Sequence, residues 1–276
     1  MKKTTLIVSV MLLFALLVSC GQEEQAQAPA PAETESAAVA EASVEEEVNA
    51  YFANMPDHIY KVNQSEFLQM VGAGSDMTII DIRRADDYAA GHIRGAVNMP
   101  WGSPAMYEML PYIPADKPVF VNCYSGQTAG QAVALLNIAG IPARSVNLGW
   151  NFGLARVEGM EQFVETEANT LPSTVQTEIP ENIMDAYVAY YEATAEAAGT
   201  PFASNIVSED NAKAIHDAGD EDVLFVSIRR PEHYAEAHIE GAINVPFGQG
   251  MQDMFGSLPA DKKLIVYCYT GQTAGQ

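Results

Sequence analysis

A nine-residue segment that occurs twice constrains the fold more than any other feature of this chain. It reads Cys-Tyr-Ser-Gly-Gln-Thr-Ala-Gly-Gln at residues 123–131, and it returns at residues 268–276 with only Ser125 replaced by Thr270. A short apolar run rich in β-branched residues precedes each copy, which is typical of a buried strand. After the first copy, apolar residues recur at helical spacing until Gly140. Each cysteine is therefore predicted to lie where a strand ends and a helix begins.

A second pair of matching segments extends the repeat. Residues 81–100 match residues 227–246, including an Arg-Arg pair and a Gly-Ala-x-Asn-x-Pro motif in both. Apolar strand patterns alternate with helical patterns along the first copy, with strands predicted at 78–82, 96–99, 119–121 and 145–148. Alternating strands and helices predict a parallel sheet with helices on both faces. We therefore expect two α/β domains of the same kind.

The repeat and the linker composition set the expected domain limits. We assign residues 47–170 to the first domain, residues 171–186 to a linker rich in Thr, Ser and Pro, and residues 187–276 to the second domain. Helices are expected over 181–198 and after Gly149-Trp150, where one would close the first domain. Gln276 matches Gln131, so we expect the second domain to be incomplete at this point and to continue in a longer chain.

The N-terminal residues indicate export. Lys2 and Lys3 precede an apolar run too short to span a bilayer, as in a secretory signal over residues 1–20. Leu-Val-Ser-Cys at its end resembles a bacterial lipobox, which predicts lipidation of Cys20; a cleaved signal with a chance cysteine is the alternative. Residues 21–46 are mostly Ala, Glu, Gln and Pro, which indicates a disordered tether. We expect a membrane-anchored lipoprotein in the cell envelope that faces outside the cytoplasm.

The charge balance excludes two classes of partner. The chain has 36 acidic and 14 basic residues and a formal net charge of −22. Nucleic acids and anionic membrane surfaces need clustered Lys and Arg, so neither is an expected partner, and membrane contact is expected through the lipid anchor alone.

The strand-to-helix position gives the two loop cysteines a specific chemistry. A thiol there faces unpaired backbone N–H groups and the positive end of the helix dipole, which favour thiolate over thiol. Gly126 and Gly271 allow several amides to point inward as an anion nest, and nearby Ser and Thr hydroxyls add donors. A buried structural cysteine is the simpler interpretation for one such residue, but two in the same setting favour a nucleophile.

The combined motifs resemble those of the rhodanese-like domains. They are Asp81-x-Arg83, Gly-His-Ile-x-Gly-Ala-x-Asn-x-Pro, and a strand that ends in Cys-x-x-Gly-x-Thr. The resemblance implies a sulfurtransferase without a metal or other cofactor, in which a loop cysteine takes sulfane sulfur from thiosulfate or a persulfide donor and passes it to a thiol acceptor. It makes Cys123 and Cys268 the nucleophiles. The loops that would cradle the persulfide are Tyr124, Ser125, Gly126, Gln127 and Thr128 in the first copy, and Tyr269, Thr270, Gly271, Gln272 and Thr273 in the second.

The chain departs from the family pattern at positions that bear on the substrate. Many active members carry Arg or Lys within the loop, where Gln and Thr stand here, so we expect weaker binding of dianions such as thiosulfate. Ser227 occupies the position of Asp81 in the second copy. Arg83 and Arg229 follow strand ends, where each could reach the substrate or form a buried ion pair that supports the loop.

Other interpretations of the same residues predict different chemistry. A cysteine phosphatase needs an arginine six residues after the nucleophile, where Ala129 and Ala274 stand, and a zinc site needs paired Cys or His ligands that the sequence lacks. His92 and His238 are expected to bond nearby backbone rather than act as general bases. A non-catalytic module that binds or carries sulfur species or a partner protein remains the alternative to the enzyme.

Overall fold

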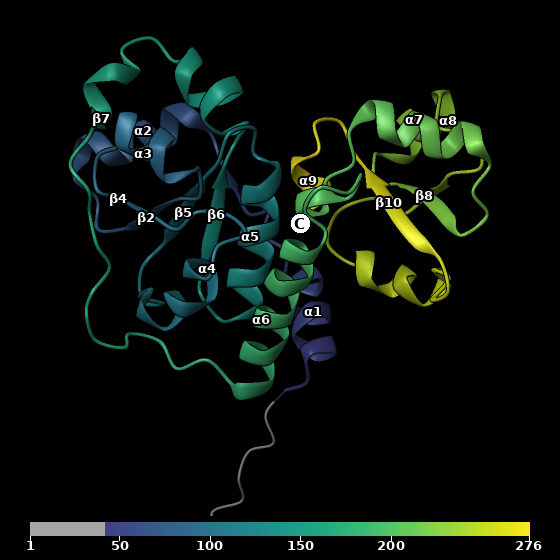
Figure 1. Cartoon of the computed structure of the whole chain (residues 1–276), viewed down its shortest axis with the longest axis horizontal. Helices are drawn as coiled ribbons and strands as arrows, with labels where there is room; N and C mark the ends of the chain where they lie inside the picture. Colours follow the sequence, from purple (N-terminus) through teal and green to yellow (C-terminus); the bar gives the residue numbers. More distant parts are fainter. Residues whose placement is uncertain (1–41) are drawn as a thin grey trace, which may run out of the picture. The chain divides into compact units, whose positions relative to one another are not determined.

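The computed structural model describes residues 42–276, which belong to one compact unit (Figure 1). The expected signal, Cys20 and the tether up to residue 41 lie outside the described residues. Within that described part, the model contains no helix that could cross a membrane. The last residues assigned to the tether are helical, because α1 (Val44–Ala53) begins with Ser43 and Glu46 in a reciprocal capping box.

The first repeat is built on a parallel sheet of five strands. Their order is β1-β6-β5-β2-β4, and every neighbouring pair is parallel. The bounds are β1 (Lys61–Val62), β2 (Thr78–Asp81), β4 (Ala96–Asn98), β5 (Val119–Asn122) and β6 (Ala143–Val146). Three of the four predicted strands agree to within one residue, and the fourth, expected at 145–148, begins two residues earlier.

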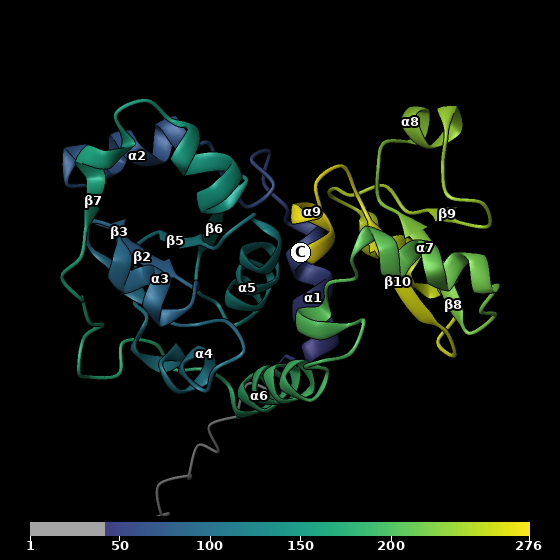
Figure 2. The same ribbon diagram turned by 45° about the horizontal axis from the view of Figure 1, so that its top comes forward.

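Helices cover both faces of this sheet, as expected (Figure 2). Ile80 and Val121 point to a core shared with α4 (Ala105–Glu108), α5 (Gln127–Ile138) and α6 (Glu181–Glu196). Ile79 and Phe120 point the other way, to α2 (Gln64–Ala73) and α3 (Ala85–Ala90). Because successive side chains of a strand face opposite sides, fully apolar strands can fill both cores.

The helix expected after Gly149-Trp150 does not form. Residues 149–163 make short π and 3₁₀ turns, and β7 (Val164–Glu165) then pairs antiparallel with β3 (His92–Ile93). Leu148, Gly149 and Gly159 have φ of 59°, 58° and 77°, which no continuous α-helix accommodates. The result is an irregular segment that passes beside the first cysteine loop.

The second repeat has a parallel sheet of three strands in the order β10-β8-β9. Their bounds are β8 (Val223–Ser227), β9 (Ile243–Asn244) and β10 (Lys263–Tyr267), and the helices are α7 (Glu209–Ala218), α8 (Pro231–Glu236) and α9 (Gln272–Gly275). These strands occupy the places of β2, β4 and β5 in the first repeat. The α/β class with two related sheets is therefore confirmed.

Two helices link the repeats. Phe52 of α1 packs edge-to-face on Phe247 and Phe255 of the second repeat, with ring centroids 6.3 and 5.2 Å apart. In α6, Tyr187 and Tyr191 are buried in the core of the first repeat, although residues from 187 onward were assigned to the second domain. The domain limits stay predictions, but α6 packs on the first sheet.

Candidate active site

Both cysteines lie in the connection between a parallel strand and the helix that follows it. Cys123 follows β5 and Cys268 follows β10. Gly126 and Gly271 are the N-caps of α5 and α9, with φ of 91° and 83°, a backbone conformation that favours glycine. The strand-to-helix position predicted for both cysteines is confirmed.

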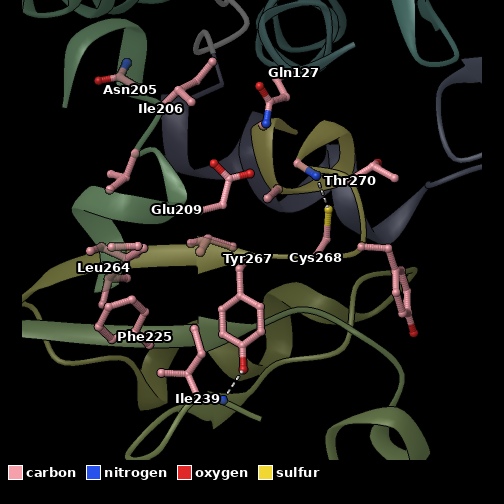
Figure 3. Close-up of a pocket in the computed structure, with 18 of the residues that line it drawn as sticks. Gln127, Asn205, Ile206, Glu209, Phe225, Ile239, Leu264, Tyr267, Cys268 and Thr270 are labelled. Atoms are coloured by element: carbon pink, nitrogen blue, oxygen red, sulfur yellow. Dashed lines mark hydrogen bonds between the residues drawn. The ribbon is translucent and has the colours of Figure 1, made fainter. Parts of the chain in front are cut away.

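In each loop the cap glycine donates its amide to the sulfur. The Gly126 amide nitrogen lies 3.0 Å from Cys123 Sγ, and that of Gly271 lies 3.1 Å from Cys268 Sγ (Figure 3). An amide that points at sulfur stabilises a negative charge there. We call the loops 123–128 and 268–273 the first and the second cup.

The two sulfurs differ in exposure. Cys123 is 1% exposed, whereas Cys268 is half-buried, and both are free thiols. The irregular segment after Leu148 packs closely on the backbone of the first cup. The Trp150 amide donates to the Cys123 carbonyl at 2.7 Å, and a Cβ on Gly149 would stand 2.5 Å from the same oxygen. Gly149 therefore allows a close approach that any other residue would prevent.

Hydrogen bonds set the ionisation of Cys268. Burial raises the pKa of its thiol, but the Thr273 hydroxyl and the amides of Thr270, Ala274 and Gly271 lower it by more, so the net pKa is lowered. The second cup thus lowers the pKa of its thiol, as expected for this geometry, even though α9 is one turn long.

The charge of Cys268 affects the ionisation of a lysine of the first repeat. Burial lowers the pKa of the Lys61 ammonium, while the charge of Cys268 raises it, so the two groups interact electrostatically. Sequence reasoning did not identify Lys61, because it is far from either cup along the chain.

A buried ion pair stands behind the first cup. Arg83 Nη2 lies 2.6 Å from Asp81 Oδ2, and both side chains are almost fully buried. The guanidinium also donates to the Gly91 carbonyl and stacks under Trp150, 3.9 Å from the ring centroid. Of the two alternatives given for Arg83, the buried ion pair is the one that forms. The Arg83 charge is neutralised by Asp81, which makes Arg83 a support of the cup wall rather than an anion ligand.

The second repeat lacks this ion pair. Ser227 occupies the position of the carboxylate, and Arg229 Nε lies 3.4 Å from its hydroxyl. Arg229 also donates to the Ala237 carbonyl and is partly exposed.

The tyrosine after each cysteine is tied to the helix that follows the Arg-Arg pair. Tyr124 donates its hydroxyl to Asp87 Oδ2 at 2.5 Å and accepts from the Arg84 amide at 3.1 Å. Tyr269 makes the equivalent contacts with His233 Nδ1 at 2.5 Å and with the Arg230 amide. Hydrogen bonding to Tyr124 lowers the pKa of Asp87, which keeps the acceptor ionised.

The remaining polar residues of the cups divide into two groups. Thr128 lies in the first turn of α5, and Ser125 Oγ lies 3.3 Å from Gln127 Oε1. Gln127 and Gln272 instead contact the opposite repeat: each side chain occupies the space beside the other cup's cap glycine. Gln127 thus contacts both its own cup, through Ser125, and the second repeat, and the assignment of the two glutamines to the persulfide loops stays a prediction.

The histidines singled out in the sequence are structural. His92 is fully buried and joins the carbonyls of Tyr88 and Glu167 at 2.8 and 3.1 Å. His238 contacts the Tyr234 carbonyl at 2.8 Å. No group of three or more metal-ligating side chains occurs among residues 42–276.

A cavity of about 700 Å³ adjoins the second cup (Figure 3). Its apolar wall includes Leu264 and Val266 of β10, each 38% exposed. The corresponding residues of the first repeat, Val119 and Val121, are fully covered in a core that includes α5. The cavity is therefore the sheet face that a helix covers in the first repeat.

Comparisons with known proteins agree with the motifs. The Rhodanese-like domain model matches residues 63–153 and again residues 209–276. The thiosulfate sulfurtransferase PspE of Escherichia coli is 32% identical over 53 residues, which cover 19% of this chain and 51% of that protein. The HTH-type transcriptional regulator Rv0324 of Mycobacterium tuberculosis is 29% identical over 150 residues, which cover 52% of this chain and 62% of that protein. The chain thus spans less than two thirds of either relative.

Two solved structures also align with much of this chain. The E. coli 3-mercaptopyruvate sulfotransferase SseA aligns over 78% of this chain and 90% of its own, with 20% identity and a TM-score of 0.39. A thiosulfate sulfurtransferase from Pseudomonas aeruginosa aligns over 84% of this chain and 43% of its own, with 21% identity and a TM-score of 0.35. Since the family model matches more than half of the residues, in two separate ranges that each contain one cup, the chain belongs to the rhodanese-like domain family as a tandem member.

Proposed function

We propose that this protein is a rhodanese-type sulfurtransferase whose loop cysteines carry sulfane sulfur as a persulfide. The observation that carries the proposal is the amide–sulfur contact made in the same way in both cups, at 3.0 and 3.1 Å. Amides fixed before the reaction stabilise the attacking thiolate, and they can stabilise the terminal sulfur anion that replaces it.

The proposed reaction has two displacement steps. The cysteine thiolate attacks the sulfane sulfur of the donor, and the donor S–S bond breaks. Its electron pair leaves as sulfite if the donor is thiosulfate, or as a thiolate if the donor is an organic persulfide. An acceptor thiolate then attacks the outer sulfur of the cysteine persulfide, takes that sulfur, and returns the cysteine as thiolate.

The cups favour a persulfide over thiosulfate as the donor. Neither cup contains Lys or Arg, and the Arg83 guanidinium is paired with Asp81. The cups themselves offer a dianion only amide and hydroxyl donors, and charge-assisted contacts are roughly twice as strong as neutral ones. A monoanionic or neutral persulfide needs less charge compensation.

Transfer to a small thiol tests the activity. We expect the wild-type protein to transfer sulfur from a small organic persulfide faster than from thiosulfate. Replacing both Cys123 and Cys268 with Ser should abolish transfer. The rates of the two single variants show how much of the transfer each cysteine contributes. Wild-type rates in the double variant would refute the proposal.

A non-catalytic carrier or docking module is the second candidate. The near-complete burial of Cys123 and the lack of a cation in either cup favour it. In that role, the variant with both cysteines replaced would keep its cellular function and its partner. Loss of cellular function with unchanged thermal stability would decide for the chemistry.

We also propose export and lipid anchoring at Cys20 in the cell envelope, with the folded part outside the cytoplasm. The Leu-Val-Ser-Cys motif after a short apolar run supports this location. Labelling of growing cells with a fatty acid should give a lipidated protein, and Cys20→Ala should remove the label. A label that survives this change would contradict the assignment.

A further inference from the structure

We propose that Gln272, a residue of the second repeat, is a positioning residue for Cys123 in the first repeat. It belongs to the second cup by sequence, but its side chain is completely buried inside the first repeat. The proposal deepens the proposed function, on which it rests in taking Cys123 as a reacting group.

The Gln272 amide is held at both ends. Its Nε2 donates to Ser145 Oγ at 2.8 Å, and its Oε1 accepts from the Leu148 amide at 3.0 Å. Both partners lie at the end of β6 or just after it. Because a buried amide that loses these contacts would be left unsatisfied, the side chain is fixed in this orientation.

One side of this amide contacts the first cup directly. A Cβ on Gly126 would stand 2.7 Å from Gln272 Cδ and Oε1. The amide of the same glycine is the donor to Cys123 Sγ. Gln272 therefore packs against the backbone that directs this amide at the sulfur.

The other side supports the wall of the cup. Leu148 has a φ of 59°, which is uncommon for a residue with a side chain, and Gln272 accepts its amide hydrogen. The next residue, Gly149, approaches the cup so closely that its Cβ would stand 2.8 Å from the amide nitrogens of Ser125 and Gly126. Gln272 thus contacts both the cap glycine and the segment that packs on the backbone of the first cup.

The helix crossing leaves no freedom to withdraw this side chain. A Cβ on Gly130 of α5 would stand 2.3 Å from the Gln272 carbonyl oxygen, and one on Gly275 of α9 would stand 2.5 Å from the Gln127 carbonyl oxygen. The two Gln-Thr-Ala-Gly segments therefore cross backbone to backbone. This crossing gives Gln272 and Gly275 a role between the repeats, whereas Thr273 and Ala274 of the same segment bond Cys268.

Alkylation of the folded protein by iodoacetamide across a range of pH tests the proposal. Peptide mass spectrometry reports Cys123 and Cys268 separately. We expect Gln272→Met to move the pH–rate profile of Cys123 to higher pH, and to slow its alkylation at neutral pH by about three- to tenfold, the factor expected for the loss of one hydrogen bond. Alkylation needs no sulfur donor, so its outcome is independent of whether the protein transfers sulfur.

Gln131→Met is the matched control. Gln131 is also buried and its side chain also bonds other elements, Tyr190 and the Ser204 carbonyl, whereas none of its side-chain hydrogen bonds goes to the first cup. We expect it to lower thermal stability and to leave the Cys123 profile unchanged. An unchanged profile in Gln272→Met, or an equal shift in the control, would overturn the proposal.

A second variant tests the role of Gln272 without replacing this residue. Gly130→Ala should displace α9 and withdraw Gln272, so it should shift the Cys123 profile in the same direction. Gly256→Ala, where a Cβ meets nothing within 4 Å, is its control. If Gln272→Met does not fold, a normal Cys123 profile in Gly130→Ala would by itself refute the positioning role.

Discussion

The Asp81 carboxylate lies 2.6 Å from the Arg83 guanidinium, and only 1% and 4% of the two side chains are exposed. Removing one partner of such a pair leaves a buried charge unpaired. We therefore expect Asp81→Ser, which reproduces the residue found at position 227, to lower the free energy of unfolding by about 3–5 kcal/mol. Urea unfolding measures this change.

The control for this experiment is the exposed pair of Lys117 and Asp76, 2.9 Å apart. Asp76→Ser should cost about 0–1 kcal/mol, as is usual for a surface ion pair. Equal losses in the two variants would show that the Arg83 ion pair does not support the fold as described.

The contact of α1 with the second repeat gives a prediction about stability. Phe52 is buried against Phe247 and Phe255, so we expect Phe52→Ala to cost about 3–5 kcal/mol in free energy of unfolding. Phe152, which is 60% exposed, is the control, and Phe152→Ala should change stability by about 0.5 kcal/mol or less. A loss in Phe52→Ala no larger than in the control would argue against this contact.

The lowered pKa of Cys268 predicts how one hydroxyl affects its reactivity. The Thr273 hydroxyl is the largest of the contributions that lower this pKa, so Thr273→Val should raise it and move the pH–rate profile of Cys268 alkylation to higher pH. Only the thiolate reacts with the alkylating agent. At a pH below the wild-type pKa, a rise of about one unit in the thiol pKa therefore slows alkylation about tenfold. Thr200→Val, in the segment before α7, should leave the profile in place. A profile displaced to lower pH in Thr273→Val would reverse the assigned role.

Neither cup has a cation in its own sequence, but the charge of Lys61 interacts with Cys268. This interaction predicts how substitutions of Lys61 affect the reactivity of Cys268. The interaction should favour the thiolate, so Lys61→Met should slow Cys268 alkylation at neutral pH while Lys61→Arg retains most of the rate. Lys117→Met controls for the loss of one positive charge elsewhere. Identical rates in Lys61→Met and the wild-type protein would exclude Lys61 from the second cup.

The sequence was sufficient for the features that depend on local pattern. The strands before each cysteine, the helix after the first cup and the α/β class follow from periodicity and from the repeat, because apolar spacing and turn residues determine these elements locally. The backbone contacts of His92 agree with the expectation from sequence, whereas the sequence left the role of Arg83 open between substrate contact and a buried ion pair.

Contacts between distant segments could not be inferred in the same way. The burial of Gln272 under β6 and the interaction of Lys61 with Cys268 join residues from different repeats, and no local pattern encodes them. The irregular segment after Leu148 was mistaken for a helix because positive φ at a non-glycine residue leaves no sequence signal. The one sequence feature that could indicate this irregular segment is Gly149, because a glycine permits the close approach to the first cup.

Mass spectrometry of the two loop cysteines after exposure to a sulfur donor tests the central claim most directly. Reduced, folded protein is incubated with a small organic persulfide or with thiosulfate, and the peptides that contain Cys123 and Cys268 are weighed. We predict a gain of about 32 Da, one sulfur atom, that a thiol acceptor removes, with Cys268 loaded faster because it is more exposed. Absence of this adduct on both cysteines with every donor would contradict the proposed persulfide chemistry.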